Sequence, residues 1–388
     1  MAFIDDINKL DDIFEYEKKK EKEYGTTIHN VSHWDSSTNF QQIMNRVLVL
    51  PKSSMPWNYC YTYSLSKKTR KGVLKHLGVP ETLLNDKMGL FLPSSTLSIV
   101  NLVNLLVHKN KKKLCILHPA YFSVEHCCDM FSLNYSIEYI SFVNGHAIIP
   151  IKKILESGYD CIWITSPIFC TSVYFDDSEI DKIIQLHKAG ITVIIDESLA
   201  LPDKELVRFV PIDKNIFFIY SPHKAISING IKFSVIVCDK SYDDFLEQWV
   251  DVFSGALSSS NQDAILHYIS QNYIFDCYPE YIKYIDDSKS KIEKIVAKYV
   301  FAQMLPNSCG HYITIFIETS INNTSDMISL AKNIINKCHT SIIPGELNGF
   351  NPISKFCFRV NLTGNIDQLC RDIENILNFF NQFLDSQK

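Results

Sequence analysis

The chain has 388 residues, of which 46% are hydrophobic and 21% charged, and its net charge is −5. This length allows two domains or one large domain with an appendage. The small net charge argues against a broad surface for nucleic acids or acidic membranes, so we expect neither partner. The twelve cysteines form no C-x-x-C pair, and most lie in apolar runs as small core residues, so no metal site is predicted. Without a visible signal peptide or membrane-length apolar stretch, we expect a cytoplasmic protein.

Short apolar runs alternate with helical patterns through the middle of the chain. Their β-branched and aromatic content is typical of strands buried on both faces of a mostly parallel sheet. Residues 176–190 instead show apolar spacing typical of a helix that stops at a glycine. The predicted strands cover 114–119, 161–167, 191–196, 215–221 and 233–239. The pattern predicts an α/β fold with a large, mostly parallel sheet between helices.

The two ends of the chain predict a smaller α+β domain. Residues 1–45 contain no strong series of strands. After about residue 280, the pattern predicts a helix, a strand, a helix, a strand and a final helix, the first four over 286–304, 311–319, 325–338 and 355–363. We therefore predict a large domain over 46–280 and a small domain formed by 1–45 and 281–388.

Chemically useful side chains follow the predicted strands. Tyr121 comes after the first strand, Asp196 ends the third, and Ser221 and Lys224 follow the fourth. Ligands of open parallel sheets collect at the carboxyl ends of the strands, so these side chains should share one edge. A single lysine or aspartate there is usually a solvated residue or a helix cap. Their combination is more informative.

A serine- and threonine-rich helix start lies upstream. Ser94, Ser95 and Thr96 precede a run with helical spacing. Such a start is usually an ordinary N-cap, although its free N–H groups and hydroxyls also suit a phosphate. A phosphate site, an aromatic ring, a carboxylate and a lysine together fit pyridoxal phosphate (PLP), which needs a Schiff-base lysine, an anion for its ring nitrogen and phosphate anchors. The glycine fingerprint of a Rossmann-type dehydrogenase is missing from the sequence.

The chain resembles the fold-type I PLP enzymes of the class I/II aminotransferase group. The similarity extends over nearly the whole length, in the order expected for that group. The segments that carry it are LGVPE (77–81), the SST helix start, PAY (119–121), SPIFCTS (166–172), IIDES (194–198), SPHK (221–224), PGE (344–346) and FRVNL (358–362).

The resemblance implies a role for each matching residue. Lys224 would form the Schiff base and move the substrate proton, Asp196 would pair with the pyridine nitrogen, and Tyr121 would stack on the ring. Arg359 would bind the substrate carboxylate, since its fork matches that group. The phosphate would be held by Ser94, Ser95, Thr96, Ser221 and Lys232, the last at the place of a family arginine and without its fork.

Two positions depart from the family pattern. Phe169 replaces an asparagine and Leu199 replaces a tyrosine, both of which hydrogen-bond the cofactor 3′-oxygen in the family. Without them the Schiff-base proton should be held more tightly. His223, beside the lysine, is open between a structural role and a contact with substrate or cofactor.

The resemblance also implies a homodimer with shared active sites. One of Tyr59, Tyr61 and Tyr63 and the segment 258–262 would reach the partner's phosphate, and residues 26–35 would close over the substrate. The expected activity is transfer of an amino group from an amino acid to a 2-oxo acid. The alternatives are a PLP-dependent lyase, cyclase, β- or γ-replacement enzyme or decarboxylase, and a non-catalytic binding module on the same fold. The amino acid itself is not identified by the sequence.

Overall fold

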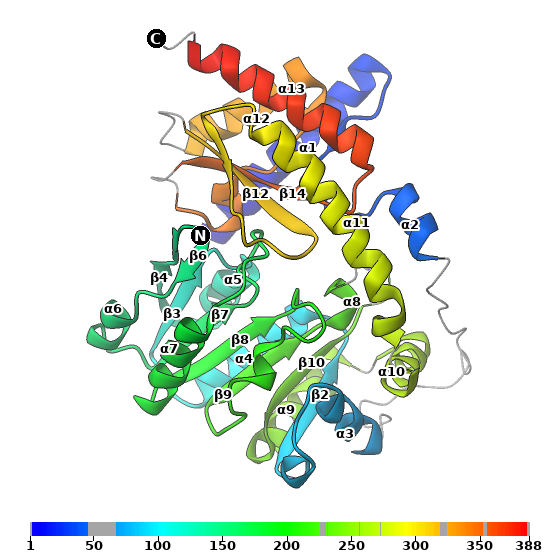
Figure 1. Cartoon of the computed structure of the whole chain (residues 1–388). Coiled ribbons are helices and arrows are strands. Elements are labelled where there is room, and N and C mark those ends of the chain that lie inside the picture. The colour runs from blue at the N-terminus through cyan, green and yellow to red at the C-terminus, as the bar shows by residue number, and fades with distance from the viewer. Residues whose placement is uncertain are drawn as a thin grey trace.

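The computed structural model describes residues 2–45, 67–225, 230, 232–255, 257–271, 273–318, 324–351 and 355–385. Its elements form two groups, a large sheet with its helices and a smaller sheet with both chain ends (Figure 1). No described helix is both long and apolar enough to cross a membrane.

The large group is built on a seven-stranded sheet in the order β2-β10-β9-β8-β7-β3-β4. The neighbouring strands from β9 to β4 are parallel, whereas β10 is antiparallel to both β9 and β2. The strands are β2 Lys87–Leu92, β3 Lys113–His118, β4 Asn134–Tyr139, β7 Cys161–Thr165, β8 Thr192–Glu197, β9 Ile216–Tyr220 and β10 Ser234–Asp239. The predicted mostly parallel sheet is confirmed.

Helices cover both faces of this sheet because successive residues of a strand point to opposite sides. In β8, Ile194 packs in the cluster formed with α4, whereas Val193 and Ile195 pack in the cluster that includes α7. The helices of this group are α3 Lys67–His76, α4 Ser95–His108, α5 Ser123–Met130, α6 Ile151–Glu156, α7 Asp177–Lys188, α8 Pro222–Ala225, α9 Asp243–Trp249 and α10 Ser259–Gln271. A small hairpin, β5 Ser141–Val143 with β6 His146–Ile148, lies between β4 and α6 in the chain.

The small group contains a three-stranded antiparallel sheet in the order β11-β12-β14. Its N-terminal helix α1 packs against α12, and the short strands β1 and β13 pair in parallel. Its elements are α1 Ala2–Tyr24, β1 His29–Asn30, α2 Thr38–Met44, β11 Ala302–Met304, β12 Tyr312–Ile317, α12 Thr324–Cys338, β13 Thr340–Ser341, β14 Phe356–Asn361 and α13 Ile366–Asp385. Residues from both chain ends therefore contribute elements to this smaller group.

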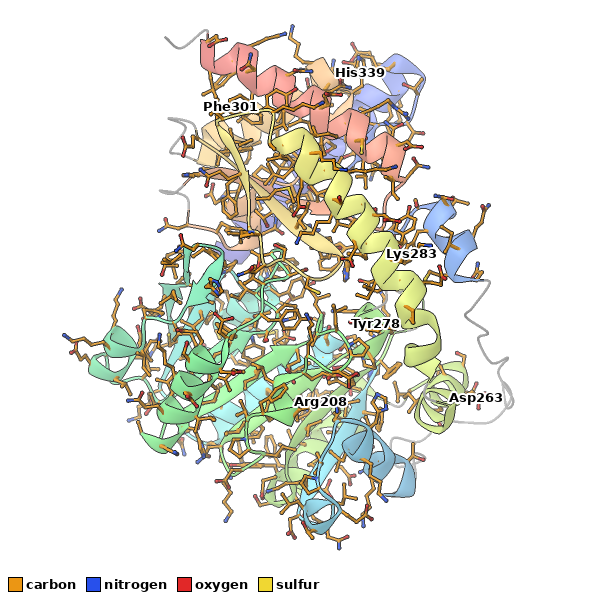
Figure 2. All side chains as sticks on the ribbon, in the orientation of Figure 1. Arg208, Asp263, Tyr278, Lys283, Phe301 and His339 are labelled. Atoms are coloured by element: carbon orange, nitrogen blue, oxygen red, sulfur yellow. The ribbon has the colours of Figure 1, made fainter. Side chains whose placement is uncertain are left out.

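Helix α11 (Tyr273–Val296) runs from the side of α10 to the small sheet (Figure 1). It packs against α13 at one end, while Tyr278 near its other end lies against the main core (Figure 2). The predicted domain boundary at residue 280 falls inside this helix, so the domain limits stay a prediction.

The predicted helix over 286–304 is wrong at both ends. Helix α11 begins earlier and ends at Val296, and Ala302–Met304 forms strand β11. Residues 302–304 pair with Ile315, Phe316 and Ile317 of β12, and this tertiary pairing outweighs the local helical pattern. Strands β2 and β4 are also absent from the sequence prediction, because β2 contains a glycine and β4 is a polar edge strand.

Candidate active site

Most of the predicted site residues line one cavity of about 550 Å³ at the carboxyl edge of the large sheet. The cavity is lined by the ends of β7 and β8, by the segments after β3 and β9, and by the start of α4. The predicted residues that line it are Ser94, Ser95, Thr96, Tyr121, Asp196, Lys224 and Lys232. Ser221 and Arg359 lie outside this lining. The structure therefore gathers residues that are up to 138 positions apart (232 − 94) around one space.

Lys224 is held at the centre of the polar side of the cavity. Its Nζ donates a hydrogen bond of 2.5 Å to Ser95 Oγ and lies 6.0 Å from the centre of the Tyr121 ring. Burial lowers the pKa of Lys224, and the charge of Lys232 adds to this, while Asp196 opposes it. A lowered pKa increases the neutral fraction of the amine, which is the nucleophilic form.

Asp196 is 3% exposed at the end of β8. Its Oδ1 accepts a hydrogen bond of 3.0 Å from the Ser198 N–H. Burial raises the pKa of Asp196, while Ser198 and the positive charge of Lys224 act in the opposite direction. A cationic group in the cavity would therefore stabilise the carboxylate further.

The start of helix α4 combines a structural and a binding role. Ser94 is its N-cap, and Ser94 Oγ accepts a hydrogen bond of 3.2 Å from Leu97 N–H, as in an ordinary cap. Ser95 Oγ instead contacts Lys224, and Thr96 also lines the cavity. A helix start of this kind carries partial positive charge and suits an anion.

Two further phosphate candidates differ in their surroundings. Ser221 is buried, and its Oγ has no hydrogen-bond partner among the described residues. Lys232 is exposed and lines the cavity, and its backbone carbonyl accepts a hydrogen bond from the side chain of Asn261. Asn261 belongs to the segment 258–262, so this segment lies beside Lys232, while its predicted contact with a partner subunit stays a prediction.

Phe169 and Leu199 give the cavity an apolar wall. Phe169 is 4% exposed and packs with Tyr121 at 5.7 Å between ring centres in an edge-to-face arrangement. Both belong to one apolar cluster with Trp34, Leu199 and Phe350. The two positions where the family has polar donors are therefore filled by hydrocarbon that faces the cavity.

His223 lines the same cavity and is 5% exposed. Burial, together with the charges of Lys224 and Lys232, lowers its pKa to about 3. Its ring packs against Phe233 at 5.5 Å. At neutral pH this imidazole is therefore neutral.

Arg359 lies in β14 behind the cavity wall and is 2% exposed. Its Nε donates 2.8 Å to Ser32 O, and its Nη1 donates 3.2 Å to Asn348 Oδ1. The guanidinium carbon lies 4.5 Å from the Trp34 ring and 5.1 Å from the Tyr312 ring, and these two rings contact each other edge to face at 5.2 Å. The side chain is therefore firmly oriented, with Trp34 closer to the cavity.

The sequence did not single out five further lining residues. They are Trp34, Asp35, Thr165, Ser198 and Gly230. Thr165 and Ser198 sit at or just after strand ends, a position that could have indicated them. Trp34 and Asp35 fall within the predicted closing segment 26–35, so this segment reaches the cavity. That the segment closes over the substrate stays a prediction. Tyr59, Tyr61 and Tyr63 lie outside the described residues.

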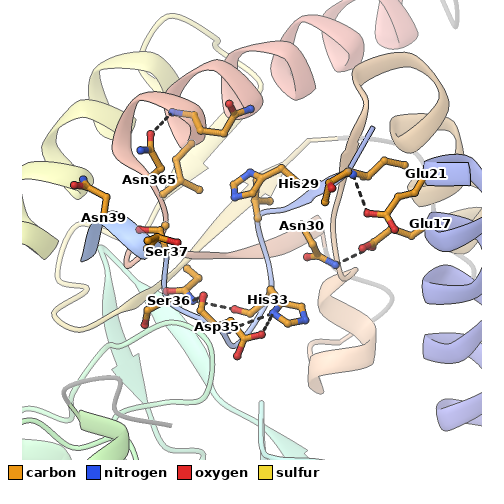
Figure 3. Close-up of a pocket in the computed structure, with 18 residues that line it drawn as sticks. Glu17, Glu21, His29, Asn30, His33, Asp35, Ser36, Ser37, Asn39 and Asn365 are labelled. Carbon is orange, nitrogen blue, oxygen red and sulfur yellow. Dashed lines mark hydrogen bonds and ion pairs between the residues drawn. The ribbon is translucent and has the colours of Figure 1, made fainter. Parts of the chain in front are cut away.

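A second cavity of about 530 Å³ lies beside the small sheet, between α1, α2 and the start of α13 (Figure 3). Its polar groups are largely paired with one another. Glu21 Oε1 accepts from Ile28 N–H at 3.0 Å, and Asn30 Nδ2 donates to Glu17 Oε2 at 3.1 Å. It contains none of the predicted catalytic residues, and no cluster of three metal-type side chains occurs anywhere in the described chain.

Solved structures align with this chain over nearly its full length. The kynurenine aminotransferase of Pyrococcus horikoshii aligns with a TM-score of 0.76 and 14% identity, covering 95% of this chain and 94% of that one. The chain has the aminotransferase fold. The alanine aminotransferase of Pyrococcus furiosus gives a TM-score of 0.75 at 14% identity and 96% of each chain, and a PLP-bound C-S lyase of Staphylococcus hominis gives 0.67 at 14% identity over 90% and 91%. No protein-family model and no curated protein matches the sequence. The predicted fold type I architecture is thus confirmed at the level of the fold.

Proposed function

We propose that this chain is a PLP-dependent aminotransferase that acts at the α-carbon of an amino acid. The observation that carries the proposal is the convergence of Lys224, Asp196 and Tyr121 on one cavity at the start of α4. Aminotransferase structures share the fold, which places such an edge at the centre of the molecule. Fold alone does not determine chemistry, so the argument rests on these side chains.

The residues present fit the cofactor. Thr165 Oγ1 and Ser198 Oγ line the cavity and are buried without a partner among the described residues, so polar atoms of a bound cofactor would satisfy them. Lys232 supplies a charge for the cofactor phosphate. Asp196 is a buried carboxylate at a strand end, with the cation of Lys224 nearby. These are the properties required of a carboxylate that pairs with a protonated ring nitrogen.

PLP, when bound, supplies an electron sink for the bond electrons left at the substrate α-carbon. Lys224 would hold the cofactor through Nζ and, after displacement by the substrate amine, would take up and return the α-proton. Asp196 would keep the ring nitrogen protonated, and Tyr121 would cover one ring face. Arg359 would bind the substrate carboxylate through the N–H groups that Ser32 and Asn348 leave open.

A second candidate is a PLP-dependent lyase, cyclase, replacement enzyme or decarboxylase. It is favoured by the apolar Phe169 and Leu199 at the positions of two family hydrogen-bond donors. Without those donors, the proton near the lysine nitrogen is held more tightly.

We further propose a homodimer, a large domain over 46–280 with a small domain of the remaining residues, and a cytoplasmic location. The dimer is supported by the exposed apolar side chains of Val252 and Phe253 near the segment 258–262. The location is supported by free thiols at all ten cysteines that the structure describes. Light scattering of the purified chain tests the dimer, and a monomeric mass at micromolar concentration would reject it.

A single-turnover experiment tests the reaction. The protein is loaded with PLP and mixed with a panel of amino acids without any 2-oxo acid. Aminotransfer predicts stoichiometric pyridoxamine phosphate and one 2-oxo acid per site. Product formation with the cofactor returned as PLP would indicate the lyase group instead. A chain that takes up no PLP at Lys224 would be a binding module, and the proposed function would fail.

A further inference from the structure

We propose that the substrate is a monocarboxylic amino acid with an aromatic or bulky apolar side chain, and that Trp34 selects it. This inference rests on the proposed function and adds the substrate class. Trp34 is treated as a specificity-determining residue, because it lines the cavity and stacks on the proposed carboxylate anchor.

The first argument is the apolar side of the cavity. Trp34, Tyr121, Phe169 and Leu199 line it and belong to one cluster that is backed by Phe350. The Trp34 and Phe169 ring centres are 6.4 Å apart, and the Tyr121 ring meets the edge of Phe169. Burying an apolar substrate group against this surface is favourable, and a ring gains additional contact energy from its aromatic neighbours.

The second argument is charge. Among the described residues that line the cavity, the cationic side chains are Lys224 and Lys232, and the proposed function uses both for the cofactor. His223 adds no positive charge at neutral pH, because burial and the two lysines lower its pKa to about 3. Asp35 adds a negative charge beside Trp34. A second carboxylate on the substrate would therefore find no cation left for it among these described lining residues.

The third argument is the position of Trp34. Arg359 does not line the cavity, whereas Trp34 does, and the indole covers one face of the guanidinium at 4.5 Å. The Tyr312 ring also contacts the guanidinium, at 5.1 Å, and lies beside the indole, with 5.2 Å between the two ring centres. A substrate whose carboxylate reaches the edge of Arg359 therefore passes along the indole ring. The contact with Trp34 thus depends on the shape and polarity of the substrate.

The Trp34 segment is fixed rather than loosely placed. His33 O accepts hydrogen bonds from Tyr312 Oη at 3.4 Å and from Asn361 Nδ2 at 3.0 Å. Asp35 O accepts a second bond from Asn361 Nδ2 at 3.1 Å. Two carbonyls that flank Trp34 are thus anchored to the small sheet, and such pre-organisation lowers the entropy cost of recognition.

Binding of unreactive analogues tests the inference without turnover. Calorimetry compares 3-phenylpropionate, a monocarboxylate with a ring, with glutarate, a dicarboxylate. With PLP-loaded wild-type protein, we expect 3-phenylpropionate to bind at least about tenfold more tightly. Trp34→Ala should weaken 3-phenylpropionate about tenfold and glutarate less than about twofold, and Trp34→Phe should lie between wild type and Trp34→Ala.

Phe209→Ala is the matched control, because Phe209 is an exposed aromatic that does not line the cavity. It should leave both affinities unchanged. Equal or tighter binding of glutarate, or unchanged 3-phenylpropionate affinity in folded Trp34→Ala and Trp34→Phe, overturns the inference. The visible absorbance of lysine-bound PLP is recorded first. If that band is absent, the proposed function fails, whereas a band without a preference for the ring rejects the substrate class alone.

Discussion

The two walls of the cavity are built differently. The wall from the large sheet is polar, and its groups lie at strand ends and at the start of α4, with Lys224 and Asp196 both shifted in pKa by burial. The second, apolar wall carries Trp34, Phe169 and Leu199, and the cation Arg359 lies behind it against the Trp34 and Tyr312 rings. Sheet topology positions the polar groups, whereas Trp34 and Arg359 are placed by packing and hydrogen bonds of the small sheet. Cofactor binding and substrate selection should therefore respond to different substitutions.

The largest expected effect comes from Lys224→Ala. Loss of the amine removes both the covalent anchor and the proton carrier, so turnover should fall by at least about 10³-fold, and the absorbance of lysine-bound PLP should disappear. Lys214→Ala, which changes an exposed lysine, should leave both unchanged. Retention of the band in Lys224→Ala would show that another amine holds the cofactor.

Asp196→Asn should act on the same wall with a smaller effect. Removing one partner of a buried ion pair costs about 3–5 kcal/mol, so PLP affinity should fall by roughly 10²- to 4 × 10³-fold. Equilibrium dialysis of PLP measures the change directly. Asp213→Asn, at an exposed aspartate, is the control. Unchanged affinity would mean that Asp196 does not contact the cofactor nitrogen.

Arg359→Lys tests whether the second wall is independent. The charge stays, but the planar fork and its contacts with the Trp34 and Tyr312 rings are lost, so carboxylate analogues should bind about tenfold more weakly. PLP affinity should remain within about twofold of wild type. A parallel loss of PLP affinity would break the separation between the two walls.

At neutral pH the smallest effect is expected for His223, because its contribution to stability changes only on acidification. Its folded pKa of about 3 lies below the ordinary value of 6.5, so the unfolded chain binds the extra proton first as the pH falls. The stability contributed by neutral His223 is thus complete above pH 6.5 and decreases down to about pH 3, by at most about 1.4 kcal/mol per pH unit. Urea unfolding of PLP-free His223→Gln should show a flatter pH dependence than wild type in this window. Identical slopes would contradict the burial of a neutral imidazole.

Local patterns were sufficient for the polar wall of the site. Lys224, Asp196 and Tyr121 each follow an apolar run, and parallel strands bring such positions to one edge, so their convergence could be predicted. The runs that became β3, β7, β8, β9 and β10 were also found to within one or two residues.

The aromatic wall could not be predicted in the same way. Trp34 and Arg359 are 325 residues apart (359 − 34), and their stacking depends on the small sheet and on hydrogen bonds from Tyr312 and Asn361. No local spacing encodes such a contact. Strand β11 was missed for a related reason, because its pairing with β12 decides its conformation.

The one reversed strand of the large sheet has a practical consequence for redesign. Because β10 runs against its neighbours, Lys232, two residues before it, reaches the same edge as Lys224, which follows β9. The connection between β9 and β10 thus places the cations of both Lys224 and Lys232 at one cavity. Insertions after β3 or β7 would lengthen a loop at the rim, whereas an insertion between residues 224 and 232 would alter the spacing of two charges. We expect this connection to be the segment of the sheet edge that tolerates changes in length least.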